Sequence, residues 1–220
     1  MSRHLFIIEG TDGSGKSTQA ALTAQALTQA GVDFTRLTFP RYQEESSALL
    51  RMYLRGDFGR QPGDVNPYAA STFFAVDRYA SFKTGWQRDW EAGKLIFCDR
   101  YTTSNAVHQS SKLPEGELEP FTRWLFDYEY NLLGLPAPTC VVFLDLPPEG
   151  SFQMLEKRQG ESGDIHELDH EYLRECYRRA LRICELEGWH RVPCAEKGVI
   201  RPPEDINRDI LAILKEELAR

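Results

Sequence analysis

Several features are scarce or missing in this sequence, and each absence narrows the class of protein. The five cysteines form no C-x-x-C pair and are odd in number, a usage that fits core residues in a reducing cytoplasm. No apolar run approaches membrane-spanning length, and the N-terminus lacks a signal-peptide pattern. Basic residues are in deficit, since the formal net charge is −7, whereas sequence-independent nucleic-acid binding needs a basic surface. We therefore expect a cytoplasmic protein that binds neither membrane nor nucleic acid.

Short apolar runs alternate with helical patterns along all 220 residues, which leaves room for one domain with a sizeable core. The runs predict strands at residues 4–8, 33–39, 94–99, 139–146 and 189–194. The helical patterns cover residues 16–31, 46–54, 66–90, 121–134, 172–184 and 202–218. Strands separated by helices indicate right-handed crossovers and a parallel sheet covered on both faces. We expect a single domain, 1–220, with three α/β/α layers around a five-stranded parallel sheet.

A glycine-rich stretch, EGTDGSGKSTQ, follows the first predicted strand. Gly10, Gly15, Lys16 and Ser17 complete the pattern G-x-x-x-x-G-K-[ST] between a strand and a helix, the context that makes this phosphate-binding motif specific. Glycines let backbone N–H groups approach phosphate oxygens, and the helix start adds the positive end of its dipole. We expect Lys16 to contact the β- and γ-phosphates of ATP and the Ser17 hydroxyl to bind Mg²⁺. The predicted ATP-binding residues are Gly10, Thr11, Asp12, Gly13, Ser14, Gly15, Lys16, Ser17 and Thr18.

The tripeptide Asp-Arg-Tyr occurs twice, in FFAVDRYASF and in LIFCDRYTTS. The first copy lies within a predicted helix and the second at the end of a predicted strand, so the two are not an internal repeat. Open parallel sheets bind ligands at the carboxyl ends of their strands. We therefore expect Asp99, in the second copy, to face the metal and Arg100 to direct its guanidinium at phosphate.

The segment TFPRY, after the second predicted strand, bears on the acceptor of the phosphoryl group. A hydroxyl acceptor needs a general base, whereas a nucleoside monophosphate already carries an anionic oxygen and needs positive charge to hold it in line. Arg41 stands here, where a nucleoside kinase would usually place a carboxylate. The residues therefore favour a phosphate as the acceptor.

Four stretches together resemble the thymidylate kinase family in order and spacing over nearly the whole chain: FIIEGTDGSGKSTQ, FPR, FFAVDR and DRYTTSNAVHQ. The resemblance implies a P-loop kinase fold, a closing lid at about residues 157–169 and a homodimer. It also implies transfer of the γ-phosphoryl group of ATP to dTMP, with Mg²⁺, giving dTDP and ADP for dTTP synthesis. The substrate-binding residues that it implies are Asp12, Phe39, Pro40, Arg41, Phe74, Arg78, Arg100, Ser104, Asn105 and His108.

Individual roles follow from the same resemblance. Phe74 would stack on thymine and Arg78 would hydrogen-bond the base; their i, i+4 spacing places both on one helix face, although ordinary core packing is the alternative for Phe74. The other implied roles are Arg41 and Arg100 at the substrate phosphate, Ser104 and Asn105 facing the base, and Asp12 near the deoxyribose 3′-hydroxyl.

The chain departs from the family pattern at three positions. Arg41 follows the proline directly rather than two residues later, and His108 replaces an aromatic residue that many members carry against the sugar. Gly13 stands where some members carry arginine, so the transition-state cation is expected from the lid, with Arg158 as the candidate and Lys157 behind it. The predicted catalytic residues are Lys16, Arg100, Asp99, Arg158 and Asp12, and the predicted metal ligands are Ser17 and Asp99.

Three alternatives remain. The stretch HELDH, residues 166–170, matches the H-E-x-x-H pattern of zinc proteases, but it lies in a polar segment near glycines and no third ligand is evident. The second alternative is a P-loop kinase that acts on another deoxynucleotide or on a deoxynucleoside. The lack of a carboxylate after the predicted strand 33–39 argues against a deoxynucleoside. The third is a non-catalytic nucleotide-binding module, which the set of Lys16, Ser17, Asp99 and Arg100 disfavours.

Overall fold

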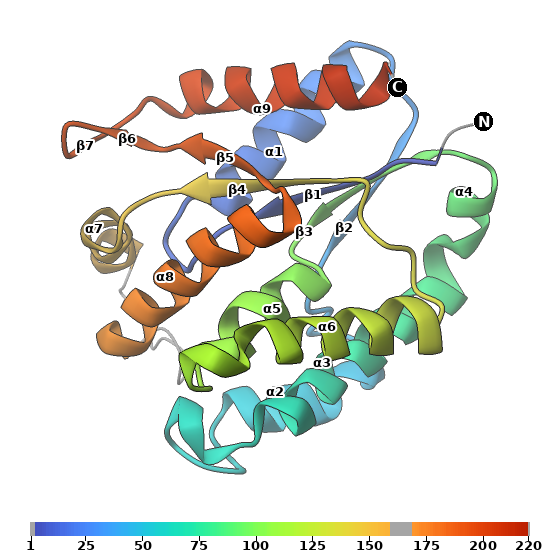
Figure 1. Ribbon diagram of the computed structural model, residues 1–220. Coiled ribbons are helices and arrows are strands. Elements are labelled where there is room, and N and C mark those ends of the chain that lie inside the picture. The colour runs from blue at the N-terminus through green and yellow to red at the C-terminus, as the bar shows by residue number, and fades with distance from the viewer. Residues whose placement is uncertain (1–2, 159–168, 220) are drawn as a thin grey trace.

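The computed structural model describes residues 3–158 and 169–219, and in this part of the chain five parallel strands form the central sheet (Figure 1). The strands are β1 (Leu5–Glu9), β2 (Phe34–Thr38), β3 (Leu95–Asp99), β4 (Cys140–Asp145) and β5 (His190–Pro193). Their order across the sheet is β2-β3-β1-β4-β5. The predicted five-stranded parallel sheet is confirmed.

Helices separate the strands, as the sequence predicts. The α-helices are α1 (Lys16–Gln29), α2 (Ala48–Leu54), α3 (Pro67–Ser81), α4 (Gln87–Glu91), α5 (Thr102–Ser110), α6 (Leu118–Phe126), α7 (Pro148–Arg158), α8 (His170–Glu187) and α9 (Pro203–Leu218). Short 3-10 turns occur at Glu45–Ser47, Pro62–Asp64 and Glu115–Glu117, and π-helical segments at Phe82–Trp86 and Asp127–Leu132. The long helix predicted over 66–90 is therefore α3 and α4 joined by a π-helical segment.

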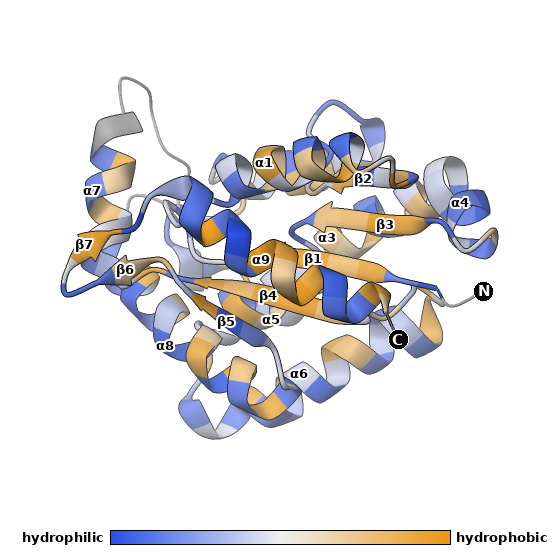
Figure 2. Ribbon diagram, turned by 90° about the horizontal axis from the view of Figure 1, so that it is seen from above, coloured by the Kyte–Doolittle hydropathy of each residue, from blue (hydrophilic) through white to orange (hydrophobic). Residues whose placement is uncertain are grey.

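Helices cover both faces of the sheet. Helices α1 and α9 lie on one face, and α3, α5, α6 and α8 lie on the other (Figure 1). The strands β1, β3 and β4 are hydrophobic along their length, whereas the helices around them carry both hydrophobic and hydrophilic residues (Figure 2). In β1, Phe6 and Ile8 pack in a cluster with Leu27 of α1 and Ile210 of α9, whereas Ile7 belongs to the cluster on the opposite face. Every β1 residue is buried, as expected for a parallel strand covered on both sides.

A short antiparallel hairpin follows β5 and was not predicted. It pairs β6 (Ala195–Glu196) with β7 (Val199–Ile200). Lys197 and Gly198 form the turn with positive φ angles of 51° and 79°, which is the backbone of a two-residue hairpin turn. The glycine at the second turn position was the available signal.

The sheet order brings three loops to one edge. β1 lies between β3 and β4, and Ile8 is opposite Asp99 in register. The loop that follows β1, the Arg100 backbone after β3 and helix α7 after β4 therefore share the carboxyl edge of the sheet, where ligands bind in open α/β folds. Across the described ranges, no helix has the length and apolar character needed to cross a membrane.

Candidate active site

The glycine-rich loop holds its lysine in a buried position. Gly15 is the N-cap of α1 with a φ of 88°, a left-handed conformation that glycine adopts without strain. The Lys16 Nζ atom donates hydrogen bonds of 2.8 Å to the carbonyls of Gly10 and Thr11, and it lies 3.9 Å from an Asp12 carboxylate oxygen. Burial, together with the nearby Arg100 charge, lowers the pKa of Lys16 to about 8. The loop thus holds a lysine whose charge is sensitive to its surroundings.

Gly13 lies against helix α7. Its φ is +81°, and a Cβ atom added here would lie 2.5 Å from the Ser151 carbonyl oxygen and 3.0 Å from Leu155 Cγ. Both the backbone angle and the close approach of α7 require glycine. The arginine that some members of the resembled family carry at this position would not fit beside α7 as it lies here.

Asp99 and Ser17 lie on the loop side of the site. Both line a cavity of about 520 Å³, here called the P-loop pocket, together with Gly13, Gly15 and Lys16. Asp99 Oδ1 is buried and has no hydrogen-bond partner among the described residues. A carboxylate oxygen that lacks a protein partner, next to a serine hydroxyl, is a donor set that suits Mg²⁺.

Arg100 has an unusual backbone conformation, with a positive φ of 64°, which is uncommon outside glycine and is found at functional sites. Its Nη2 atom donates to Asp12 Oδ1 in an ion pair. Burial alone would lower the pKa of Arg100, but the Asp12 and Glu9 carboxylates raise it above its usual value. Asp12 therefore joins the P-loop to the strand end that carries Arg100.

His108 lies on the other side of the Arg100 guanidinium. Its Nε2 atom is 3.4 Å from Arg100 Nη1 and its Nδ1 atom is 3.5 Å from Cys176 Sγ. Because a guanidinium only donates, Nε2 accepts and the proton of the neutral ring is on Nδ1. The Tyr172 hydroxyl donates to the His108 carbonyl at 2.6 Å and fixes the backbone behind the ring. The role of His108 at the sugar stays a prediction.

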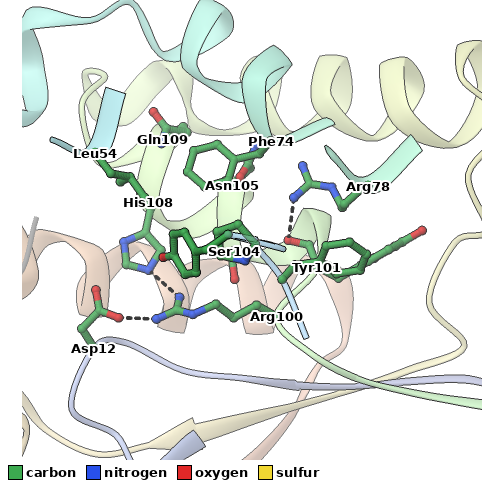
Figure 3. Close-up of a pocket in the computed structure, with 13 residues that line it drawn as sticks. Asp12, Leu54, Phe74, Arg78, Arg100, Tyr101, Ser104, Asn105, His108 and Gln109 are labelled. Atoms are coloured by element: carbon green, nitrogen blue, oxygen red, sulfur yellow. Dashed lines mark hydrogen bonds and ion pairs between the residues drawn. The ribbon is translucent and has the colours of Figure 1, made fainter. Parts of the chain in front are cut away.

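A second cavity, here called the acceptor pocket, lies beside these groups (Figure 3). Its lining residues are Asp12, Phe39, Pro40, Tyr42, Leu54, Phe74, Arg78, Arg100, Tyr101, Ser104, Asn105, His108 and Gln109. They come from the P-loop, the segments after β2 and after β3, and helices α2, α3 and α5. All the predicted substrate-binding residues except Arg41 are thus brought together around one pocket, although their roles remain predictions.

Arg41 lies apart from this group. Its Nη2 atom pairs with Glu44 at 2.7 Å, and its side chain is not among those that line the acceptor pocket. The Arg41 backbone N–H donates to Asp77 at 2.9 Å, so the aspartate of the first Asp-Arg-Tyr copy holds the segment after β2. The neighbouring Tyr42 lines both pockets instead. Contact of Arg41 with a phosphate stays a prediction.

Phe74 and Arg78 lie at the opposite end of the acceptor pocket from Asp12 (Figure 3). The Phe74 ring meets Tyr53 edge-on, with centroids 6.2 Å apart and planes at 82°. Arg78 is buried and donates two hydrogen bonds to Glu129, which also accepts one from Thr102. The structure thus separates the two arginines: Arg100 lies beside the P-loop and Arg78 at the far end.

A buried acid supports the start of α5. Glu9, the last residue of β1, accepts hydrogen bonds from Thr103 Oγ1 at 2.8 Å and from Ser104 Oγ at 2.7 Å. The Ser104 hydroxyl proton is therefore directed at Glu9, and its oxygen lone pairs remain for the pocket. Asn105 Nδ2 donates to the Ser71 carbonyl at 3.3 Å, which orients its side chain.

Gln109 was not predicted as a site residue. It is fully buried and lines the acceptor pocket, yet neither Oε1 nor Nε2 has a hydrogen-bond partner within the described ranges. A buried carboxamide without partners is costly, and a ligand edge that offers both a donor and an acceptor would satisfy it. Its position as the last residue of the motif DRYTTSNAVHQ was the available signal.

Glu9, Glu129 and Tyr42 were also missed. Glu9 ends an apolar run, and Glu129 continues the buried helix face of Phe121 and Leu125 at a spacing of four. An acid on an apolar face is the signal that would have identified both glutamates, because a buried carboxylate needs partners. Tyr42 has no comparable signal.

The predicted lid lies mostly outside the described residues. Helix α7 ends at Arg158, whose side chain is not described, and residues 159–168 fall in the same gap. His166 and Glu167 of the H-E-x-x-H pattern lie in that gap, whereas His170 begins α8 and stacks on Phe152 at 4.1 Å. Over residues 3–158 and 169–219, no group of three or more His, Cys, Asp or Glu side chains could hold a metal.

The two pockets share a wall. Asp12, Phe39, Pro40, Tyr42 and Arg100 line both. A group bound at the P-loop and a group bound in the acceptor pocket would therefore face each other across Asp12 and Arg100. This geometry suits the transfer of a charged group from one ligand to another.

Comparison with known proteins identifies the family. The sequence model of thymidylate kinase matches residues 8–201. The chain is 33% identical over 174 residues to a thymidylate kinase of Mycobacterium tuberculosis, covering 76% of this chain and 79% of that protein. It is 28% identical over 220 residues to a probable thymidylate kinase of Pyrococcus horikoshii (99% and 98%), and 31% identical over 157 residues to a thymidylate kinase of Ruegeria pomeroyi (71% and 70%). The chain therefore belongs to the thymidylate kinase family.

Proposed function

We propose that the protein is a dTMP kinase that transfers the γ-phosphoryl group of ATP to dTMP, giving dTDP and ADP for dTTP synthesis. The shared wall of the P-loop pocket and the acceptor pocket is the observation that carries the proposal. ATP bound at the P-loop would present its γ-phosphate to Arg100 and Asp12, and the phosphate of dTMP would meet it there. An anionic phosphate oxygen attacks the γ-phosphorus, and the electrons of the breaking P–O bond leave with ADP.

The donor side would be held by the P-loop. Backbone N–H groups of residues 10–18 would bind the phosphates, and Lys16 would exchange its carbonyl contacts for phosphate oxygens. Ser17 and Asp99 would hold Mg²⁺, and the unpartnered, buried Asp99 Oδ1 fits that role. When bound, the metal neutralises charge on the β- and γ-phosphate oxygens.

The acceptor side would hold dTMP from both ends. Arg100 would bind its phosphate, and Asp12 would lie near the deoxyribose 3′-hydroxyl. At the far end, Phe74 would stack on the base, while Arg78 and the unpaired carboxamide of Gln109 would hydrogen-bond its edge. A nucleobase edge supplies both donors and acceptors, which is the complement that Gln109 lacks in the protein.

The ionisable side chains that line the acceptor pocket favour a nucleoside monophosphate over a nucleoside as the phosphoryl acceptor. Among the residues described as lining it, Asp12 carries the only carboxylate, and this group is ion-paired with Arg100. A carboxylate held by an arginine is a weak general base, because the pair stabilises its unprotonated form. A nucleoside hydroxyl would therefore lack an effective base, whereas the phosphate of dTMP needs none.

A panel of acceptors tests the proposal. Initial rates of ADP formation from ATP are measured with dTMP, thymidine, dAMP and dGMP at equal concentrations. We expect the highest rate with dTMP and no rate above background with thymidine. Faster turnover of thymidine, or of a purine monophosphate, would contradict the assignment.

We further propose that the whole chain, 1–220, is one kinase domain of a cytoplasmic homodimer. The five cysteines are odd in number and buried in the core, a usage that suits a reducing compartment. Val76 and Tyr79 are apolar and 51% and 41% exposed one turn apart on α3, as expected of a face that a second copy covers.

The Val76 site gives a test of the dimer. The substitution Val76→Arg adds a charge to an exposed position and so leaves the core of the chain intact. Sedimentation velocity should show a dimer for the wild type and a monomer for the variant at the same concentration. A wild type that sediments as a monomer, or a variant that stays dimeric, contradicts this assembly.

A further inference from the structure

Glu129 and Arg78 form a buried pair at the base end of the acceptor pocket, joining segments 51 residues apart in the chain. Arg78 Nε donates to Glu129 Oε2 at 2.7 Å, and Arg78 Nη2 donates to Oε1 at 2.5 Å. Arg78 is 1% exposed and Glu129 is fully buried. Two parallel N–H···O bonds fix the plane of a guanidinium as well as its distance. The pair therefore sets which edge of Arg78 the pocket receives.

The remaining donors of Arg78 point away from the acid. A guanidinium has five N–H groups; two are used on Glu129, and Nη1 directs one at the Tyr101 carbonyl, 3.4 Å away. One N–H group of Nη1 and one of Nη2 remain. Arg78 lines the pocket next to Phe74 and Asn105 (Figure 3), so these two groups are the donors available to a ligand.

The pairing also changes what Arg78 can attract. Burial alone would lower the pKa of Arg78, but the charge and hydrogen bonds of Glu129 raise it, so Arg78 keeps its charge within the ion pair with Glu129. An unpaired arginine here would compete with Arg100 for the phosphate of a nucleotide. Arg100 instead contacts Asp12 through Nη2 alone, and it is partly exposed.

A third contact holds the acid in place. Thr102 Oγ1 donates to Glu129 Oε2 at 2.7 Å, so this oxygen accepts from both Thr102 and Arg78. Thr102 is the first residue of α5, the helix that also carries Asn105 and Gln109 into the pocket. The carboxylate is thus fixed relative to the other groups at the base end.

We propose that Glu129 is a positioning residue that holds Arg78 as a donor edge for a carbonyl oxygen of the base. Glu129 thereby sets how strongly the pocket prefers a pyrimidine with a carbonyl at ring position 4 over one with an amino group there. An amino group donates, so it would leave the N–H groups of Arg78 unpaired in a buried site, and sites built to hydrogen-bond a substrate reject such analogues strongly. This inference rests on the proposed function and names the selectivity of its base site.

The matched substrates dUMP and dCMP test it, since they share sugar and phosphate and differ at this edge of the base. We expect wild-type kcat/KM to be higher for dUMP than for dCMP. In Glu129→Gln, kcat/KM for dUMP should fall on the order of 10- to 100-fold, the worth of a hydrogen bond to a charged group. The kcat/KM for dCMP and the KM for ATP should change little. The ratio of kcat/KM for dUMP to kcat/KM for dCMP, here called the dUMP:dCMP ratio, should therefore fall.

A second arginine pair, buried at the arginine and partly exposed at the glutamate, provides the control. Arg179 Nε donates to Glu175 at 2.7 Å on α8, and neither residue lines the acceptor pocket. Glu175→Gln should lower the melting temperature and keep the wild-type dUMP:dCMP ratio. If Glu129→Gln does not fold, Glu129→Asp decides: it retains the charge but withdraws the carboxylate by one methylene, and the ratio must still fall.

Three results would overturn the inference. The first is an unchanged ratio in a folded Glu129 variant, which would make the pair merely structural. The second is an equal loss of ratio in Glu175→Gln. The third is a wild-type enzyme that phosphorylates dTMP yet treats dUMP and dCMP alike, and this result leaves the proposed function standing. Absence of wild-type activity on both dTMP and dUMP would instead refute the proposed function itself.

Discussion

At the scale of single residues, the charge of Lys16 makes ATP binding at the P-loop depend on pH. Its pKa is lowered to about 8 by burial and by Arg100, so the ligand-free protein loses this charge as the pH rises through 8. ATP phosphates favour the charged lysine and raise its pKa again, so binding above pH 8 must take up a proton. We predict little uptake at pH 6.5 and up to about one proton per ATP at pH 9.

Calorimetry of ATP binding in buffers with different ionisation enthalpies measures this uptake. In Lys16→Met the pH-dependent uptake should vanish, because the group that titrates is gone. The same uptake in the variant as in the wild type would assign the proton to another group.

Phe74 and its neighbour Phe73 give a matched pair of substitutions. Phe74 lines the acceptor pocket, whereas Phe73 packs against Tyr53 and Phe58 with centroids 6.4 and 5.7 Å apart. Phe74→Ala should weaken dTMP binding by ~1–3 kcal/mol, the worth of one base stack, and leave ATP binding unchanged. Phe73→Ala should lower the melting temperature and keep dTMP affinity. If titrations show the reverse, Phe74 is a core residue.

At the scale of secondary structure, periodicity predicted the strands and helices but not the contacts between them. The predicted first strand ended at Ile8, one residue before the end of β1, and so Glu9 was placed in the loop instead of the buried strand. Its bond to Thr103 spans 94 positions of sequence, and that of Arg78 to Glu129 spans 51. Such contacts depend on how helices pack across the sheet, which residue spacing does not encode. The P-loop residues, in contrast, were predicted from local spacing alone.

Helix α7 is the element that would carry the lid. It packs on Gly13 of the P-loop through Ser151 and Leu155, and Met154 and Leu155 line the P-loop pocket. Arg158, one turn beyond Met154 at the end of this helix, is our candidate for the cation that neutralises charge during transfer. Arg158→Ala should lower kcat by ~10³-fold or more, with little change in either KM, because the contact is made only in the transition state.

Lys157→Ala is the companion variant and should lower kcat less, since lysine lacks the planar group that binds two phosphate oxygens. Steady-state kinetics of both variants with dTMP and ATP measure the effect. A normal kcat in Arg158→Ala would mean that Lys16, Arg100 and the metal neutralise the charge of the transferring phosphoryl group without a residue of the lid.

At the scale of the whole molecule, the sheet order assembles the site. β1 lies between β3 and β4, so the P-loop, Arg100 and α7 converge although they are separated by many residues of sequence. A parallel sheet was predictable from alternating strands and helices, whereas this order was not, because several orders satisfy the same crossovers. The resemblance to a family supplied what the residue pattern left open, including the predicted contact of Phe74 and Arg78 with the base.

The central claim is that one nucleotide donates a phosphoryl group and a monophosphate held beside it accepts that group. The measurement that tests it most directly is a time course with ATP, dTMP and Mg²⁺ in which all four nucleotides are separated and quantified. The account predicts that ADP and dTDP appear in equal amounts as dTMP disappears, and that Lys16→Met, which leaves the P-loop without its cation, abolishes both. Formation of ADP without dTDP, or of dTDP at the wild-type rate in Lys16→Met, would contradict it.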